Sequence, residues 1–205
     1  MTWSRILKFA LWTGLGLALA IAALIGVALV LMTGQTGRDV VESFADGREA
    51  GRYGVIEIDD LSGDPLSDLS IGRLTLTDED GVWLEIENAR IVWRPSALLG
   101  RELAVESLSA ERVHVWRRPR PAAASGEGGF GDGGFRVRVD AFDVTTLALD
   151  EPVVGVAAEY TARGDLVRAD GAVSLDAVLD RLDQPGDRII AEARFGEDIR
   201  VDAEI

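Results

Sequence analysis

The chain has 205 residues and carries 35 acidic against 21 basic side chains, which gives a formal net charge of −14 at pH 7. This balance argues against a nucleic-acid partner, because proteins that bind nucleic acid present basic patches. The sequence has no cysteine and a single histidine, His114. Disulfides, thiolate metal sites and paired histidine ligands are therefore excluded.

The N-terminal part of the chain predicts a membrane helix. The stretch Phe9–Gly37 carries no charge, and Arg5 and Lys8 precede it. Its apolar core is longer than the about 20 residues that a transmembrane helix needs, whereas a cleaved signal peptide usually has only about 7–15. We expect residues 1–37 to form a cytoplasmic tip and an uncleaved signal-anchor helix. The basic flank keeps the N-terminus cytoplasmic and sends the rest of the chain across the membrane.

Residues 38–119 are expected to form a β-domain on the far side of the membrane. Asp39–Arg52 has helical character, and from Tyr53 apolar and polar residues alternate with period two. The alternation slips at Gly72-Arg73, as it would at a β-bulge. Asp78–Gly81 predicts a hairpin turn, and Pro95 ends a strand because it cannot donate to a ladder.

A second strand array is expected after a loop. Residues 120–134 are rich in Gly, Pro and Ala and predict a flexible connection. Residues 135–205 continue the alternation and stop within it, so we expect a chain truncated at the C-terminus. Within this array, Gly164 is expected to form a turn between two strands, and Val178–Leu182 a helical turn.

Turn signals recur at roughly 10–15 residue spacing without a long helix between them, which is typical of an antiparallel meander. The expected fold is mainly β: a transmembrane helix followed by an elongated, curved antiparallel sheet that forms a groove, in a fragment of a longer chain. The strands would have one apolar and one polar face.

The apolar face has two interpretations. It could pack against a helix or a second sheet as an ordinary core, or it could line a groove that shields acyl chains, each buried CH₂ contributing about 0.8 kcal/mol. The candidate lining residues are Leu69, Ile71, Leu74, Leu76, Val82, Leu84, Ile86, Ile91, Val113, Val115, Val144, Leu147 and Leu149.

The sequence shows no catalytic constellation. His114 lies in an alternating strand, where a lone histidine is usually a strand-face residue. The acidic run Asp78–Asp80 lacks the spacing of a calcium loop and is better explained as turn chemistry. We therefore expect no enzyme activity, no cofactor and no metal site.

The segment Leu61–Pro119 contains Asp80-Gly81-Val82-Trp83-Leu84 and then Trp93-Arg94-Pro95 followed by Leu98-Leu99, in this order after the expected N-terminal anchor. With these motifs the segment resembles the N-terminal region of the TamB family. The motif residues are Gly81, Trp83, Trp93 and Pro95.

TamB-like proteins belong to the AsmA-like, bridge-like lipid transfer group, so the resemblance implies a β-taco with an apolar channel. It implies a bacterial inner-membrane anchor, a periplasmic sheet and phospholipid transport toward the outer membrane. It also implies assembly of outer-membrane proteins and autotransporters with the barrel TamA, through a C-terminal region that this chain is expected to lack. The alternative is a scaffold that assists insertion of outer-membrane proteins by strand pairing, without conducting lipid.

Overall fold

A computed structural model describes residues 48–49, 54–64, 67–120, 136–169, 172–184, 186–195 and 200–204. The predicted anchor at 1–37 and nearly all of the predicted loop at 120–134 lie outside these ranges. Within them, no helix is long and apolar enough to cross a membrane. Where the expected helix over Asp39–Arg52 is described, at Arg48–Glu49, the chain is a short strand.

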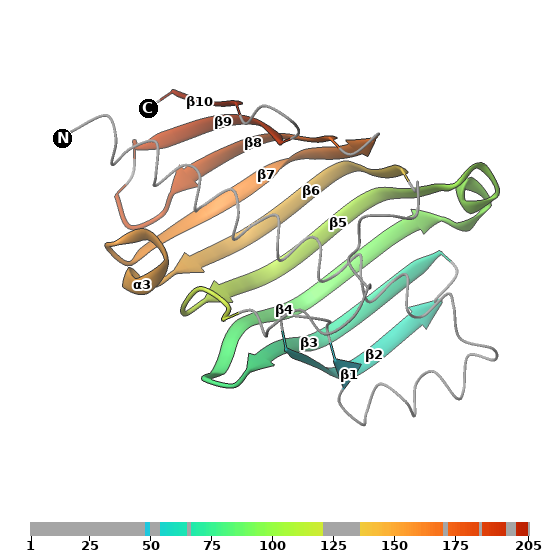
Figure 1. The fold of residues 1–205 in the computed structure, drawn as a ribbon, viewed down its shortest axis with the longest axis horizontal. Coiled ribbons are helices and arrows are strands. Elements are labelled where there is room, and N and C mark those ends of the chain that lie inside the picture. The colour runs from blue at the N-terminus through green and yellow to red at the C-terminus, as the bar shows by residue number, and fades with distance from the viewer. Residues whose placement is uncertain are drawn as a thin grey trace.

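The described residues form one open sheet of ten strands, arranged in chain order from β1 to β10 (Figure 1). The strands are β1 (Arg48–Glu49), β2 (Val55–Asp64), β3 (Asp68–Asp78), β4 (Gly81–Arg94), β5 (Glu102–Val115), β6 (Arg136–Leu149), β7 (Ala158–Ala169), β8 (Ala172–Arg181), β9 (Arg188–Phe195) and β10 (Arg200–Glu204). This confirms the prediction of a mainly β, mostly antiparallel architecture.

One pair of neighbours departs from the antiparallel pattern. β5 and β6 run parallel, with Glu102 opposite Arg136 and Val115 opposite Leu149. Parallel strands cannot be joined by a tight turn, because the chain must return along the length of the sheet. The Gly- and Pro-rich segment predicted as a loop falls in this connection.

The turn chemistry around β4 follows the sequence. β3 and β4 are joined at Glu79-Asp80, where the Asp80 N–H donates to the Asp78 Oδ1 at 2.9 Å and Gly81 has φ 103°. At its other end β4 stops at Arg94, and Pro95 begins the 3₁₀ helix η2 (Pro95–Gly100).

Two predictions about the second half of the sheet are wrong. Gly164 makes no turn but lies within β7, and residues 178–181 belong to β8 and not to a helical turn. A Cβ at Gly164 would stand 1.9 Å from the backbone oxygen of Asp176 on β8. The glycine therefore permits close approach of two strands, whereas the sequence alone suggested a reversal.

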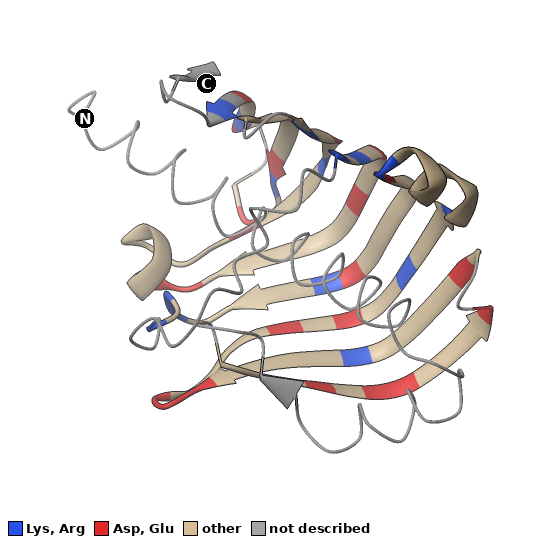
Figure 2. Ribbon diagram, turned by 45° about the vertical axis from the view of Figure 1, so that its right-hand side comes forward, with Lys and Arg blue, Asp and Glu red and all other residues tan. Residues whose placement is uncertain are grey.

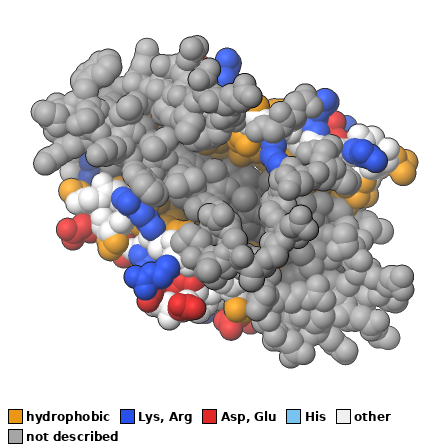
Figure 3. Space-filling model, in the orientation of Figure 1, with side chains coloured by type: hydrophobic (Ala, Val, Ile, Leu, Met, Phe, Trp, Pro, Cys, Tyr) orange, Lys and Arg blue, Asp and Glu red, His pale blue; other side chains and the backbone are white. Residues whose placement is uncertain are grey.

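Apolar side chains gather on one face of the sheet and charged side chains on the other. Helical structure is sparse in the part of the chain that the structure describes. Besides η2 it contains α3 (Glu151–Val154), at the end of β6. Val153 of α3 joins the hydrophobic cluster built on one side of the sheet. Figure 3 shows hydrophobic side chains on the side seen in Figure 1, with charged side chains toward its edges.

Candidate functional site

The most extensive feature of the structure is a continuous apolar face. We use this name for the side of the sheet on which Leu74 lies, and cross-strand pairing shows which residues of the other strands lie on the same side. Leu74 pairs with Ile58 and Ile86, and Ile86 pairs with Val113. Val113 in turn faces Leu147 across the parallel pair, and the same side continues through β7 and β8 to β9. The apolar face thus spans eight adjacent strands.

Of the predicted lining residues, all but Val82 lie on the apolar face and are at most 6% exposed. They are Leu69, Ile71, Leu74, Leu76, Leu84, Ile86, Ile91, Val113, Val115, Val144, Leu147 and Leu149. The structure therefore brings these side chains together on one surface.

The placement of Val82 is corrected. Val82 pairs with Thr77 on the opposite side and is 41% exposed, whereas Trp83 is 1% exposed and belongs to the hydrophobic cluster. The cause is a bulge: the register of β3 and β4 shifts between Leu76 and Thr77. A bulge inserts one residue and exchanges the faces that simple alternation predicts.

The sequence analysis missed much of the apolar face on β4 to β8. These further buried residues are Ala89, Trp93, Leu103, Val105, Leu108, Ala110, Val137, Val139, Phe142, Ala158, Tyr160, Ala162, Leu166, Leu175, Ala177 and Leu179. The alternation of β7 and β8 could have revealed some of them, but alanines and Gly164 dilute the apolar signal there. Other buried residues were missed because the alternation of β5 and β6 changes phase within each strand.

Charge enters the apolar face near its margins. On β7 and β8 the register places Arg168 near one end of the strands and Arg181 at the other. The Arg181 guanidinium is paired with Asp183 at 2.8 Å and with Asp187 at 3.8 Å. Tyr160 pairs with Arg181 on β8 and is 1% exposed, and this burial raises the pKa of its phenol to about 12.

The opposite side, here called the polar face, is covered by cross-strand ion pairs. Charged positions recur along neighbouring strands in Figure 2. The pairs include Arg73–Glu85, Arg90–Asp68, Arg94–Glu106, Arg112–Glu159 and Arg163–Asp180. Most of these side chains are well exposed, so each pair contributes only about 0–1 kcal/mol to the stability of the fold. The main effect of these charges is to make this side of the sheet hydrophilic.

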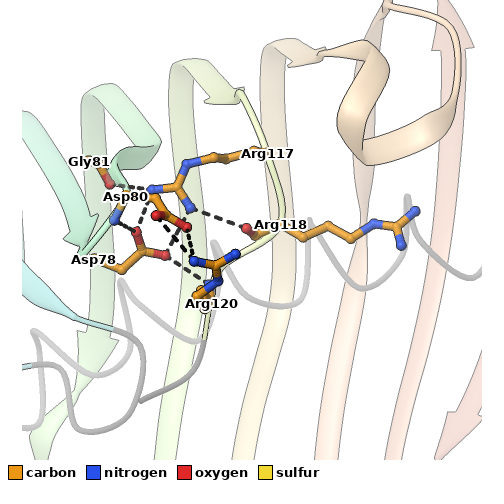
Figure 4. Close-up of polar contacts among 6 residues, drawn as sticks. All are labelled: Asp78, Asp80, Gly81, Arg117, Arg118 and Arg120. Carbon is orange, nitrogen blue, oxygen red and sulfur yellow. Dashed lines mark hydrogen bonds and ion pairs between the residues drawn. The ribbon is translucent and has the colours of Figure 1, made fainter.

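One ion pair is more deeply buried than the others: the Asp78 side chain is 4% exposed and the Arg117 side chain is 23% exposed. The Arg117 guanidinium contacts both carboxylate oxygens of Asp78 and donates to the Gly81 carbonyl (Figure 4). The Arg120 backbone N–H also donates to Asp78, at 2.8 Å. The bond from Arg117 is the main reason why the pKa of Asp78 lies well below its usual range. This clasp fixes the start of the β5–β6 connection against the β3–β4 turn.

His114 occupies the polar face as predicted for a strand-face histidine. Its Nε2 lies 3.0 Å from the Asp150 Oδ1, and its ring centroid lies 4.3 Å from that of Trp116. Across the described ranges no group of three or more His, Cys, Asp or Glu could hold a metal ion. The acidic turn Asp78–Asp80 is engaged with arginines instead.

The four motif residues have structural positions around β4. Gly81 supplies the positive φ of the turn, Trp83 and Trp93 are buried in the hydrophobic cluster, and Pro95 opens η2. Comparisons of the chain with protein-family models, with curated proteins and with solved structures each found no match.

Proposed function

We propose that this chain is an inner-membrane-anchored periplasmic module of the TamB kind that carries phospholipid toward the outer membrane along its apolar face. In this account residues 1–37 hold the N-terminus in the cytoplasm and the sheet in the periplasm. The module would contribute to assembly of outer-membrane proteins and autotransporters together with the barrel TamA.

The observation that carries the proposal is the continuity of the apolar face. Eight strands contribute to it, and on β7 and β8 its charged residues, Arg168 and Arg181, lie near the strand ends. An apolar face of this extent, with ion pairs on the polar face of the same sheet, suits the transport of a lipid whose acyl chains must be kept from water over a long path.

The physical role requires no chemical step. A lipid tail leaving the bilayer would expose its methylenes to water at about 0.8 kcal/mol each, so an apolar lining lowers that barrier by several kcal/mol. Leu84 and Leu147 are fully buried, so a tail must enter as the apolar face opens and must replace the contacts that these side chains make. The competing interpretation is a permanently packed core.

Site-specific photo-crosslinking distinguishes the two interpretations. A photo-reactive amino acid placed at Leu84 or Leu147 in the full chain should capture phospholipid in cells. The matched control is Val82, which is two residues from Leu84 but lies on the polar face, and it should capture none. Equal labelling at Leu84 and Val82, or none at Leu84 and Leu147, would contradict the proposal.

A second candidate function is strand pairing with outer-membrane proteins during their insertion. The sheet is open, and β10 pairs with β9 on one side. An unpaired strand edge can accept a further strand through backbone hydrogen bonds. If this is the function, prolines in β10 should abolish activity, whereas Leu84→Asp with Leu147→Asp should leave it unchanged in any protein that still folds. The lipid proposal predicts the reverse.

A further inference from the structure

Five residues form a row across β2 to β6: Asp60, Gly72, Asn88, Glu111 and Thr145. The residues of the row lie opposite one another on neighbouring strands. The backbone pairs before and after the row have the same register, so at the row no strand of β2 to β6 gains a residue relative to its neighbour. The flanking pairs are Asp59↔Arg73 and Leu61↔Ile71, Arg73↔Glu87 and Ile71↔Ala89, Glu87↔Arg112 and Arg90↔Ser109, and Ala110↔Val144 and Arg112↔Thr146.

At this row every strand changes the phase of its alternation. On β3, for example, Leu69 and Ile71 precede Gly72 on the apolar face, and Leu74 and Leu76 follow it there, so one residue has been added to the period of two. A slip of one residue in a single strand would turn half of its apolar side chains to the polar face. Because five strands slip at the same level, the apolar face stays continuous.

β7 marks where the row ends. Ala158, Tyr160, Ala162 and Leu166 keep strict alternation along this strand, with Gly164 between the last two. The register of β6 with β7 shifts at two places, between Val144 and Leu147, which flank Thr145, and again between Val139 and Phe142, away from the row. At the row β6 therefore has one residue more than β7. This is expected if β6 carries an added residue at Thr145 and β7 does not.

The backbone of the row is specialised for a bend. Asp60 and Asn88 have φ of 56° and 50°, a left-handed conformation that is uncommon outside glycine. A Cβ at Gly72 would lie 2.7 Å from the Cβ of Asp60, so glycine allows the two strands to approach. The Asn88 Nδ2 donates to the Glu111 Oε2 at 2.5 Å, which ties neighbouring strands together. Added residues of this kind bend strands and curve sheets.

We propose that these five residues act together as one crease. The crease bends β2 to β6 along a single line, keeps the apolar side chains on both sides of that line on one face, and so fixes the angle between the two halves of the apolar face. This inference concerns the shape of the sheet and holds whatever molecule the apolar face binds.

The test is concerted deletion. Removing all five residues from the full chain should restore alternation across the row in each of the five strands and should also remove the register shift of β6 with β7 between Val144 and Leu147. We expect this variant to fold cooperatively, with the β-sheet circular dichroism of the original protein. Deleting Asn88 alone should abolish cooperative unfolding in urea, because the two parts of β4 would then present opposite faces.

The proposal would be overturned if the concerted deletion were no better folded than the single one, or if the single deletion were tolerated. A substitution pair gives a second measurement that does not depend on the deletions. Asn88→Gly and Asn88→Val both lose the bond to Glu111, but only glycine accepts the left-handed conformation, so Asn88→Val should have the lower urea midpoint of the two. Equal midpoints for these two variants would show that the crease does not require its left-handed backbone at Asn88.

Discussion

At the scale of the residue, small departures from alternation decide which side chain meets the apolar face. Val82 and Trp83 exchange the roles that their sequence positions suggested, because the ladder shifts by one residue beside them. Asp78 likewise was predicted as a turn residue, and it is also the acceptor that holds Arg117. Neither outcome is visible in the sequence, since the first depends on the register of two paired strands and the second on a partner 39 residues away along the chain.

The Asp78–Arg117 clasp predicts a specific dependence of stability on pH. Asp78→Asn should lower the free energy of unfolding by about 2 kcal/mol at neutral pH, because it removes hydrogen bonds to a charged group. The pKa of Asp78 is lowered on folding, so the stabilisation is present above the pKa of the unfolded state and is lost as pH falls toward that of the folded state. The difference between the two proteins should therefore shrink below about pH 4.

Urea denaturation at several pH values measures this difference. Asp80→Asn is the matched control, since Asp80 is 45% exposed and its pair with Arg120 lies at the surface. Its effect should stay below about 1 kcal/mol at every pH. A constant difference between the original protein and Asp78→Asn across the acid range would refute the assigned titration.

Tyr160 reports directly on how dry the apolar face is. Burial raises the pKa of its phenol to about 12, so an ultraviolet titration should show a late ionisation that Tyr160→Phe removes. Because the neutral phenol is favoured in the folded state, stability should fall as pH rises above the ordinary tyrosine value of about 10. Ionisation of Tyr160 near that ordinary value would mean that water reaches this part of the apolar face.

At the scale of the element, the strands follow from alternation and a tight turn from local residue preferences, but a long connection does not. The β3–β4 turn and the end of β4 at Pro95 were predictable, because Asp-Gly and Pro act through local backbone preferences. The parallel pairing of β5 with β6 was not, since it depends on the path of a long connection. Gly164 was mistaken for a turn residue because glycine serves both turns and close strand contacts.

The close contact at Gly164 gives a prediction for β7 and β8. Gly164→Ala should destabilise the protein by about 1–3 kcal/mol, since the added Cβ would force the backbone of Asp176 to move. Thermal unfolding measures the loss. Gly100→Ala is the control, because nothing lies within 4 Å of a Cβ built at Gly100. If both variants unfold at the same temperature, β7 and β8 do not need glycine at this point.

At the scale of the whole molecule, the sequence predicted a mainly β chain with one apolar side, and the structure confirms this in its described residues. It brings all but one of the predicted lining residues to that side. What alternation could not predict is the extent of the apolar face, because the slips at the crease break the periodicity within each strand. When the five strands are aligned by their backbone pairing, these changes of phase all fall opposite one another.

The central claim is that the apolar face holds lipid, and native mass spectrometry of the detergent-extracted full chain tests it most directly. The account predicts that phospholipid co-purifies with the original protein and with Val82→Asp. It also predicts that lipid is lost from a folded Leu84→Asp, Leu147→Asp variant. Original protein that emerges folded and free of phospholipid, or a double variant that retains it, would contradict the account and favour a permanently packed interior.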